Sequence, residues 1–337
     1  MNKPVTPNLT RVQPVTVTID NFTRAESDMY FASTIKLAGG IGRFDHRREL
    51  MPTEAQTVVR ANRDTLYSAA VIDLDAGPAT VTLPDAGGRF MSLMALDEDQ
   101  YAFGVWYGAC AVTFTRERVG TRYMMAAVRT LVDPTTPGDF ERAHALQDRI
   151  GIEQPRAGRF EVPDCDAASQ GRVRDALVAL GASLPDWRRT FGTREQVHPV
   201  RHLVGTAVGW GGNPERHAIY LGVAPPRNDG RTVHRLRLGE VPVDGFWSIS
   251  VYNALGYFEP NARDAYTVNG YTAQREEDGT VLVQFGACAD GNEHRNGRAA
   301  NCLPVMPGWN YTVRLYRPRA ELLTGAWTFP VAAPAAS

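Results

Sequence analysis

The sequence predicts a mainly β protein with two antiparallel sandwiches, a helix near the N-terminus and a helical segment between the sandwiches. Short runs in which apolar and polar residues alternate occur over about residues 66–132 and again from about residue 218. Between about residues 136 and 210 the apolar period becomes helical. The length of 337 residues exceeds one ordinary hydrophobic core, which also favours two domains.

The N-terminal unit is expected to cover residues 19–135, after an extended arm at residues 1–18. Asp20 can cap a first helix, and the pair Gly39-Gly40 can end it. Three strands are expected after a charged loop, at residues 66–74, 79–83 and 90–96. Short strands divided by proline and glycine turns are typical of an antiparallel meander, so this unit is expected to be a sandwich.

The spacing of apolar residues changes from helical to alternating between the middle and the end of the chain. A helical segment is expected at residues 136–212, with helix starts at Thr136-Pro137-Gly138-Asp139 and at Asp166. The glycine-rich run from Gly205 to Gly212 does not match the dinucleotide fingerprint and is interpreted as a turn into the second sheet. The second sandwich is expected at residues 213–330, followed by a disordered tail at 331–337.

The composition excludes several classes of function. Hydrophobic residues make up 43% and charged residues 22%, as in globular proteins, and the net charge is −1 with no basic stripe, so no nucleic acid partner is expected. No apolar run is long enough for a membrane helix, and the first twenty residues lack the apolar core of a signal peptide. The cytoplasm is therefore the expected compartment, with no membrane partner.

Cysteine and lysine usage narrows the chemistry. None of the four cysteines (Cys110, Cys165, Cys288 and Cys302) forms a C-x-x-C pair, which disfavours a zinc ribbon or a thioredoxin-like redox site. Cys288 and Cys302 could form a disulfide, although a reducing compartment would disfavour it. Only Lys3 and Lys36 are lysines, so a Walker phosphate loop is absent and a pyridoxal enzyme has a single poor candidate. No cofactor is predicted.

A charged motif precedes the first strand and is the strongest functional signal. Arg60, Asn62, Arg63 and Asp64 crowd into five residues just before the apolar run from Leu66. Such groups need hydrogen-bond partners if they are buried. They either brace one another or face a ligand at the mouth of a pocket, where arginine suits a carboxylate or phosphate.

Other polar patterns have both a structural and a functional interpretation. Asp97-Glu98-Asp99 could bind a cation or act as an acid/base pair, although a solvated strand end is the more common role. His198 and His202 are four residues apart, as in metal-binding helices, but Pro199 lies between them and no third ligand is evident. A structural histidine pair is the better interpretation, and no metal is predicted.

Two late strands carry hydroxyl and basic side chains on one face. In residues 246–253, Trp247 belongs to the apolar face, whereas Ser250 and Tyr252 belong to the other. In residues 309–316, Arg314 and Tyr316 lie on the polar face. Such faces either wall a polar ligand site or contact solvent.

The quoted motifs resemble two known families. N-R-D-T-L-Y-S at 62–68 and L-P-D-A-G-G-R-F at 83–90 resemble the domain-of-unknown-function family numbered 1254. V-D-G-F-W-S-I-S-V-Y-N at 243–253 and the closing V-R-L-Y-R-P at 313–318 resemble its companion, number 1214. The resemblance implies an immunoglobulin-like sandwich, a helical segment and a C-terminal jelly-roll-like sandwich, and it implies no mechanism. Many relatives have Asn-Trp-Leu-Pro where this chain has Asn301-Cys302-Leu303-Pro304.

Two hypotheses of function remain open, and in both the partner is a small polar or anionic molecule. In the first, the protein is a hydrolase or lyase that works by general acid/base chemistry in a cleft between the domains, without a G-x-S-x-G nucleophile. The predicted catalytic residues are Asp64, Tyr67 and Tyr252. The predicted substrate-binding residues are Arg60, Asn62, Arg63, Trp247, Ser250 and Arg314. Ser68 would need an activating partner that the sequence does not identify.

In the second hypothesis, the same residues bind a sugar or carboxylate without turnover. A third interpretation is an assembly protein whose polar motifs only join the domains. The sequence leaves open whether the chain forms a homo-oligomer.

Overall fold

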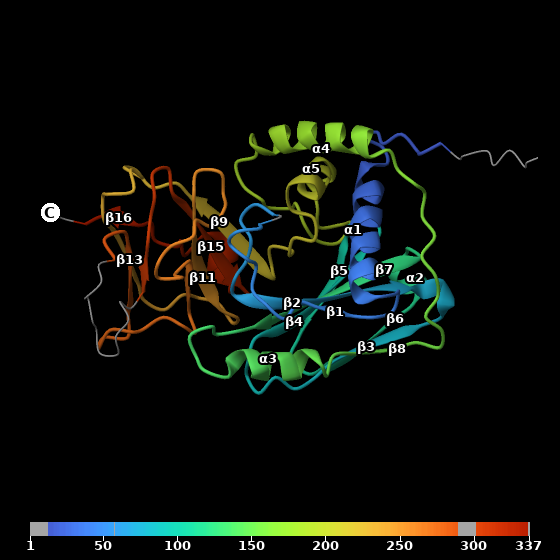
Figure 1. Cartoon of the computed structure of the whole chain (residues 1–337), viewed down its shortest axis with the longest axis horizontal. Coiled ribbons are helices and arrows are strands. Elements are labelled where there is room, and N and C mark those ends of the chain that lie inside the picture. The colour runs from blue at the N-terminus through green and yellow to red at the C-terminus, as the bar shows by residue number, and fades with distance from the viewer. Residues whose placement is uncertain (1–12, 57, 289–300, 336–337) are drawn as a thin grey trace, which may run out of the picture.

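The computed structural model describes residues 13–56, 58–288 and 301–335. It is mainly β, with several antiparallel sheets and additional helices, as the sequence predicted. Figure 1 shows the two β-rich halves beside each other, with the long helices packed on the N-terminal half. No helix in the described parts of the chain is long and apolar enough to cross a membrane.

The N-terminal half has two sheets that face each other. The larger has the order β1-β2-β7-β4-β5, with β1 Asp45–His46, β2 Thr65–Asp73, β4 Met91–Asp97, β5 Ala102–Tyr107 and β7 Tyr123–Leu131. The smaller has the order β6-β3-β8, with β3 Ala79–Leu83, β6 Cys110–Phe114 and β8 Gly151–Glu153. A core of buried side chains, among them Leu93, Val128 and Phe114, fills the space between these sheets.

Helix α1 Phe22–Ala38 covers the opposite face of the larger sheet, together with α4 Ala167–Gly181 and α5 Pro199–Gly209. The other helices are α2 Arg116–Val119, α3 Asp139–Gln147 and α6 Ala320–Thr324, with a short 3-10 helix at Leu74–Ala76. Phe31 of α1 packs on Val71 and Met94 of the sheet, and α4 and α5 lie against α1 (Figure 1). Gly39 ends α1 at a φ of 72°, where glycine carries no Cβ penalty.

The C-terminal half also has two sheets around one core. One has the order β12-β11-β15-β9, with β9 Ala218–Val223, β11 Trp247–Tyr252, β12 Thr267–Asn269 and β15 Asn310–Tyr316. The other has the order β14-β13-β10-β16, with β10 His234–Leu238, β13 Val281–Phe285, β14 Cys302–Leu303 and β16 Ala333–Pro334. Trp309, Tyr311 and Phe285 stack in the core between them.

The two halves touch through aromatic side chains. Phe90, before β4, packs edge-on against Phe246 with ring centroids 5.0 Å apart. Tyr316 of β15 stacks on Phe246 at 4.4 Å. This apolar contact fixes β15 of one half beside the larger sheet of the other, so polar residues of both halves meet next to it.

Several predicted boundaries are wrong. Residues 205–209 of the glycine-rich run continue helix α5, because their backbone N–H groups pair inside the helix, and only the residues after Gly209 form the turn. The tail from Val331 was expected to be disordered, but Ala333 and Pro334 pair with β10. Part of the predicted N-terminal arm lies outside the described residues, and Val15 forms an isolated bridge with Cys165.

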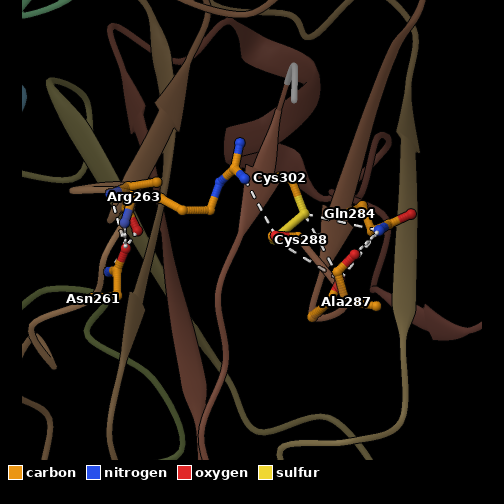
Figure 2. The surroundings of a disulfide bond; sticks show 8 residues. Asn261, Arg263, Gln284, Ala287, Cys288 and Cys302 are labelled. Atoms are coloured by element: carbon orange, nitrogen blue, oxygen red, sulfur yellow. Dashed lines mark hydrogen bonds between the residues drawn. A yellow bond between two sulfur atoms is a disulfide. The ribbon is translucent and has the colours of Figure 1, made fainter. Parts of the chain in front are cut away.

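Cys288 and Cys302 form a disulfide, which the sequence allowed but did not favour (Figure 2). Arg263 donates a hydrogen bond to the carbonyl of Cys288 at 3.2 Å, and the Gln284 amide donates to the carbonyl of Ala287 at 3.3 Å. The disulfide closes a segment of sequence separation 14 at the end of β13.

Candidate functional site

The polar face of the β12-β11-β15-β9 sheet is buried against the charged motif of the N-terminal half. Ser250, Tyr252 and Arg314 are all almost fully buried, so this face does not contact solvent. The charged motif supplies the cover, because the carbonyls of Arg60 and Ala61 both accept hydrogen bonds from Arg314. The predicted solvated face is therefore an interface between the halves.

Arg314 organises this interface. Its guanidinium donates to the Arg60 carbonyl at 2.7 Å, the Ala61 carbonyl at 3.1 Å, the Ser250 hydroxyl at 2.9 Å and the Tyr252 hydroxyl at 2.7 Å. The Tyr252 hydroxyl in turn donates to the Ala61 carbonyl at 2.7 Å. Every polar group of Tyr252 and Ser250 thus has a protein partner, and neither side chain is placed to meet a substrate.

Asp64 is also held by the second half. One carboxylate oxygen accepts from the Asn269 amide at 3.0 Å and from the Thr267 hydroxyl at 3.2 Å. The other oxygen has no hydrogen-bond partner within the described residues, although Asp64 is only 1% exposed. Arg314 attracts this carboxylate electrostatically from nearby. Asp64 therefore acts as an interface anchor with one unpaired oxygen.

The remaining arginines of the motif have separate partners. Arg60 donates to the Asn310 side-chain oxygen at 2.6 Å and to the Thr312 hydroxyl at 3.2 Å. Arg63 donates to the Met51 carbonyl and lies over the Tyr266 ring at 4.9 Å. Neither forms a salt bridge with Asp64 in the described part of the chain. Both predicted substrate-binding arginines therefore have partners within the protein, and neither is paired with Asp64 in the described residues.

Trp247 does not reach this interface. It points to the opposite face of β11 and packs in the core of the C-terminal half, where it is 5% exposed. A predicted substrate-binding role for Trp247 has no geometric support, because the alternation along the strand places it away from Ser250 and Tyr252.

A second polar cluster lies beside the interface and contains Tyr67 and Asn62. Tyr67 of β2 is paired in register with Arg129 of β7, so both side chains project from the same face of the larger sheet. The Arg129 guanidinium lies over the Tyr67 ring, 5.4 Å from its centroid. The Asn62 amide donates to the Tyr67 hydroxyl at 3.1 Å and to the Tyr316 hydroxyl at 3.4 Å.

Arg129 differs from Arg314, the other buried arginine of the junction, because phenols and not a carboxylate are its main electrostatic partners. It is 9% exposed, and its guanidinium donates to the Asn213 side-chain oxygen at 3.4 Å and to the Tyr67 hydroxyl. No carboxylate lies within salt-bridge distance of it among the described residues. A buried cation normally has a counter-ion, since an unpaired one costs several kcal/mol. Arg129 is therefore a candidate binding group for an anion.

The electrostatics of the cluster separate its two phenols. Burial alone would raise the pKa of Tyr67, but the Arg129 cation and the hydrogen bond from Asn62 outweigh it, so the pKa lies below the ordinary value. Burial raises the pKa of Tyr316 well above its ordinary value, and the neighbouring phenols Tyr220 and Tyr67 add to this. Tyr67 is the phenol that ionises first, and Tyr316 is the one that stays protonated. Opposite shifts of this kind are common among catalytic acid/base pairs.

Part of the cluster is accessible to solvent. Arg129 and Tyr316 are buried, whereas Tyr67, Asn62 and Tyr220 keep part of their surface accessible despite their place between the two halves. The Tyr220 hydroxyl accepts from the Asn213 amide at 2.8 Å, which extends the cluster to β9. A small molecule that reached Tyr67 would meet a cation, an amide and hydroxyl groups.

Sequence reasoning missed Arg129 as a functional residue. It lies in the run Y-M-M-A-A-V-R-T-L, where it is the one charged residue of a nine-residue strand. A lone arginine in an otherwise apolar strand is the signal that could have found it, because burial of such a charge needs a reason. The partners could not have been found from sequence, since Asn213 and Tyr316 are about 80 and 190 positions away.

The acidic run at residues 97–99 and the histidine pair His198 and His202 have structural roles. Asp97 and Glu98 are buried rather than solvated, and Glu98 accepts from the backbone N–H of Tyr123 at 2.9 Å. Both ring nitrogens of His202 lie near backbone carbonyls, whereas His198 begins α5. No group of three or more metal-ligating side chains occurs in the described chain.

Ser68 has the activating partner that the sequence did not identify, but it is closed to substrate. Its hydroxyl is 2.8 Å from Nδ1 of His46 and accepts from the Gln147 amide at 3.1 Å. Ser68 of β2 is 1% exposed, because its side chain is covered by α3. The pair therefore joins helix to strand, and the cluster around Tyr67 remains the better candidate site.

The fold and the site define a mainly β chain of two joined halves with an arginine–tyrosine cluster at their junction. Residues 41–113 match the model of the family described as "Protein of unknown function (DUF1254)", and residues 225–320 match "Protein of unknown function (DUF1214)". The two matches lie in the N-terminal and C-terminal halves respectively, as the resemblance predicted.

Two solved structures match most of the chain. The VPA0106 protein from Vibrio parahaemolyticus has a TM-score of 0.71 at 17% identity, and the match covers 94% of this chain and 98% of that protein. A putative uncharacterised protein from Burkholderia cenocepacia has a TM-score of 0.48 at 16% identity, over 89% of this chain and 84% of the other. The first likeness shows the fold alone. No curated protein matches the chain.

Proposed function

We propose that this protein is an acid/base enzyme of the lyase class that acts on a small carboxylate-bearing molecule at the junction of its two halves. The observation that carries the proposal is Arg129, a buried cation with no carboxylate partner in the described chain, facing Tyr67 and Asn62. Arginine and amide donors suit a carboxylate. A phenol next to them is a suitable proton acceptor.

The proposed reaction is an elimination next to the carboxylate. Arg129 and the Asn62 amide would hold the carboxylate and neutralise its charge, which makes the hydrogen on the adjacent carbon more acidic. The ionised Tyr67 oxygen would take that proton, and the pair of electrons from the broken C–H bond would form the new C=C bond. The substituent on the next carbon would leave with its bonding electrons and accept a proton from Tyr316. Water would restore both phenols to their starting states.

Electrostatics support the division of roles. Tyr67 has a lowered pKa, so a larger share of it is ionised near neutral pH than of an ordinary tyrosine. The proposed activity should therefore rise with pH and level off above the lowered pKa of Tyr67. Hydrolysis is the weaker alternative, because Ser68 is sealed and Asp64 is bound to the second half.

Turnover by the Tyr67→Phe variant tests the proposal. A panel of carboxylic acids with a hydroxy, alkoxy or amino group on the β-carbon would be screened. The unsaturated product would be detected by its ultraviolet absorbance. The wild type should convert at least one compound, and Tyr67→Phe should lose at least about 100-fold in rate while it keeps carboxylate binding. Tyr252→Phe is the matched control and should keep turnover, although it removes a hydroxyl from the sealed interface.

Non-catalytic carboxylate or sugar binding is the second candidate, and a separate groove favours it. A hollow of about 570 Å³ lies at the end of the interface and is lined by Arg63, Thr267 and Asn269 among others. Its polar groups are engaged with one another, since Asn269 accepts from the backbone of Tyr271 and Thr272. The groove offers binding groups without an evident proton acceptor. Binding without turnover, lost on Arg63→Ala and kept on Arg129→Met, would favour it.

We also propose a finer fold assignment and a compartment. The facing sheets of each half support an immunoglobulin-like sandwich and a jelly-roll-like sandwich as the finer fold assignment. The Cys288–Cys302 disulfide supports an oxidising compartment in place of the cytoplasm expected from the sequence, because disulfides persist in such compartments. Recovery of both cysteines as free thiols from cells quenched with an alkylating reagent would contradict that assignment.

A further inference from the structure

A cavity of about 380 Å³ lies next to the Arg129 cluster, on the side of strand β9. It is lined by residues 186–191 before α5, by β9 and by residues 322–329 at and after α6. Most of its wall is apolar, and the aromatic contributors are Trp187, Phe191, Tyr220, Trp327 and Phe329. The volume is within the range of ordinary small-molecule sites, about 300–1,000 Å³.

Two side chains belong to both the cavity and the cluster. Asn213 and Tyr220 line the cavity, and the Asn213 amide donates to the Tyr220 hydroxyl at 2.8 Å. The oxygen of the same Asn213 side chain accepts from Arg129 at 3.4 Å. One asparagine therefore lies between the apolar cavity and the cation and contacts both.

We infer that this cavity holds the apolar part of the substrate, so that the substrate is a carboxylate with an aliphatic or aromatic chain. The inference rests on the proposed function and adds the substrate class to it. A chain attached to a carboxylate at Arg129 would pass Asn213 and lie against Trp187 and Trp327. Unbranched polar acids would leave this apolar wall in contact with water.

The test is a series of straight-chain carboxylates, from acetate to octanoate, bound to the full-length protein and measured by calorimetry. Each added methylene buried in the cavity should tighten binding about fourfold until the cavity is full. Trp187 and Trp327 should report the longer chains by a change in fluorescence. Arg129→Met should weaken the whole series.

A filled-cavity variant and a matched control sharpen the test. Leu323 lines the cavity, so Leu323→Trp should weaken octanoate at least tenfold and leave acetate unchanged. Val178 is exposed on α4 and lies outside the cavity wall, so Val178→Trp should leave both unchanged. The wild-type series decides the question even if Leu323→Trp does not fold.

The failures are distinguishable. Equal affinity for acetate and octanoate, with both lost on Arg129→Met, would overturn the cavity assignment and leave the carboxylate site intact. Chain-length dependence that survives Arg129→Met unchanged would overturn both the link to Arg129 and the proposed function. An absence of binding across the series would also overturn both.

Discussion

Arg129 and Arg314 are both buried arginines at the junction, but replacement by methionine should affect them in opposite ways. Arg314 donates four hydrogen bonds, two of them to the backbone carbonyls of Arg60 and Ala61, and it lies near the Asp64 carboxylate. Arg314→Met would remove all of them and leave Asp64 as an uncompensated buried charge. Each buried acceptor left without a donor costs about 1–3 kcal/mol, and breaking a buried charge network costs about 3–5 kcal/mol.

Arg129→Met should leave the free energy of unfolding within about 1 kcal/mol of the wild-type value. It would lose a long hydrogen bond to Asn213 and one to the Tyr67 hydroxyl, each worth about 1 kcal/mol, and the contact with the Tyr67 ring, worth about 0.5–2 kcal/mol. It would also remove the cost of keeping an unpaired cation out of water, which offsets these losses. Carboxylate binding should weaken by about 3 kcal/mol, or about 150-fold in Kd.

The assay is urea unfolding of the wild type and both variants, followed by tryptophan fluorescence, together with calorimetric titration of a binding carboxylate. The expected pattern is a strong loss of stability for Arg314→Met only, and a strong loss of binding for Arg129→Met. If Arg129→Met destabilised the protein as much as Arg314→Met, Arg129 would be a structural residue and the reasoning would be refuted.

Three further predictions concern other buried groups. Burial, assisted by the negative charge of Glu98, raises the pKa of Asp28 to about 7. The folded protein therefore binds this proton more tightly than the unfolded chain does. As a result, Asp28 lowers the free energy of unfolding as the pH rises from about 4 to 7. Asp28→Asn should remove that decline and raise the melting temperature at pH 8, and an unchanged pH profile would contradict the assignment. The double replacement Cys288→Ser and Cys302→Ser should cost about 3 kcal/mol of stability, since the disulfide closes a loop of sequence separation 14; reducing agent should then destabilise the wild type but not the variant. Asp64→Asn should retain turnover, because Asp64 is bound to Asn269 and Thr267 rather than to the open space; loss of turnover with unchanged folding would restore Asp64 as a catalytic residue.

Much of the fold could be predicted from local patterns. Alternation predicted strand β3 at its observed bounds, and Asp166 caps α4 by accepting from the backbone N–H of Ser169, as its place in the sequence predicted. These features depend on neighbours in the chain. The β16 pairing of Ala333 and Pro334 could not be predicted, because it depends on the open edge of β10, about a hundred residues earlier.

The site was harder to predict because it is made of long-range contacts. The charged motif was correctly singled out as unusual, yet most of it braces the second half, and only Asn62 and the adjacent Tyr67 face the open cluster. The polar face of β15 was also identified, but its burial depends on which surface covers it. Local spacing carries no information on that cover. Arg129 was missed because its partners come from three distant segments, around residues 67, 213–220 and 316.

The measurement that tests the central claim most directly is the pH titration of Tyr67, followed through the ring carbon that bears its hydroxyl by NMR with labelled tyrosine, using Tyr67→Phe to assign the signal. We expect Tyr67 to ionise at a lower pH than an ordinary tyrosine in the wild type. In Arg129→Met we expect the midpoint to move upward. A wild-type Tyr67 that titrates at or above the ordinary pKa of about 10, with no response to Arg129→Met, would contradict the account.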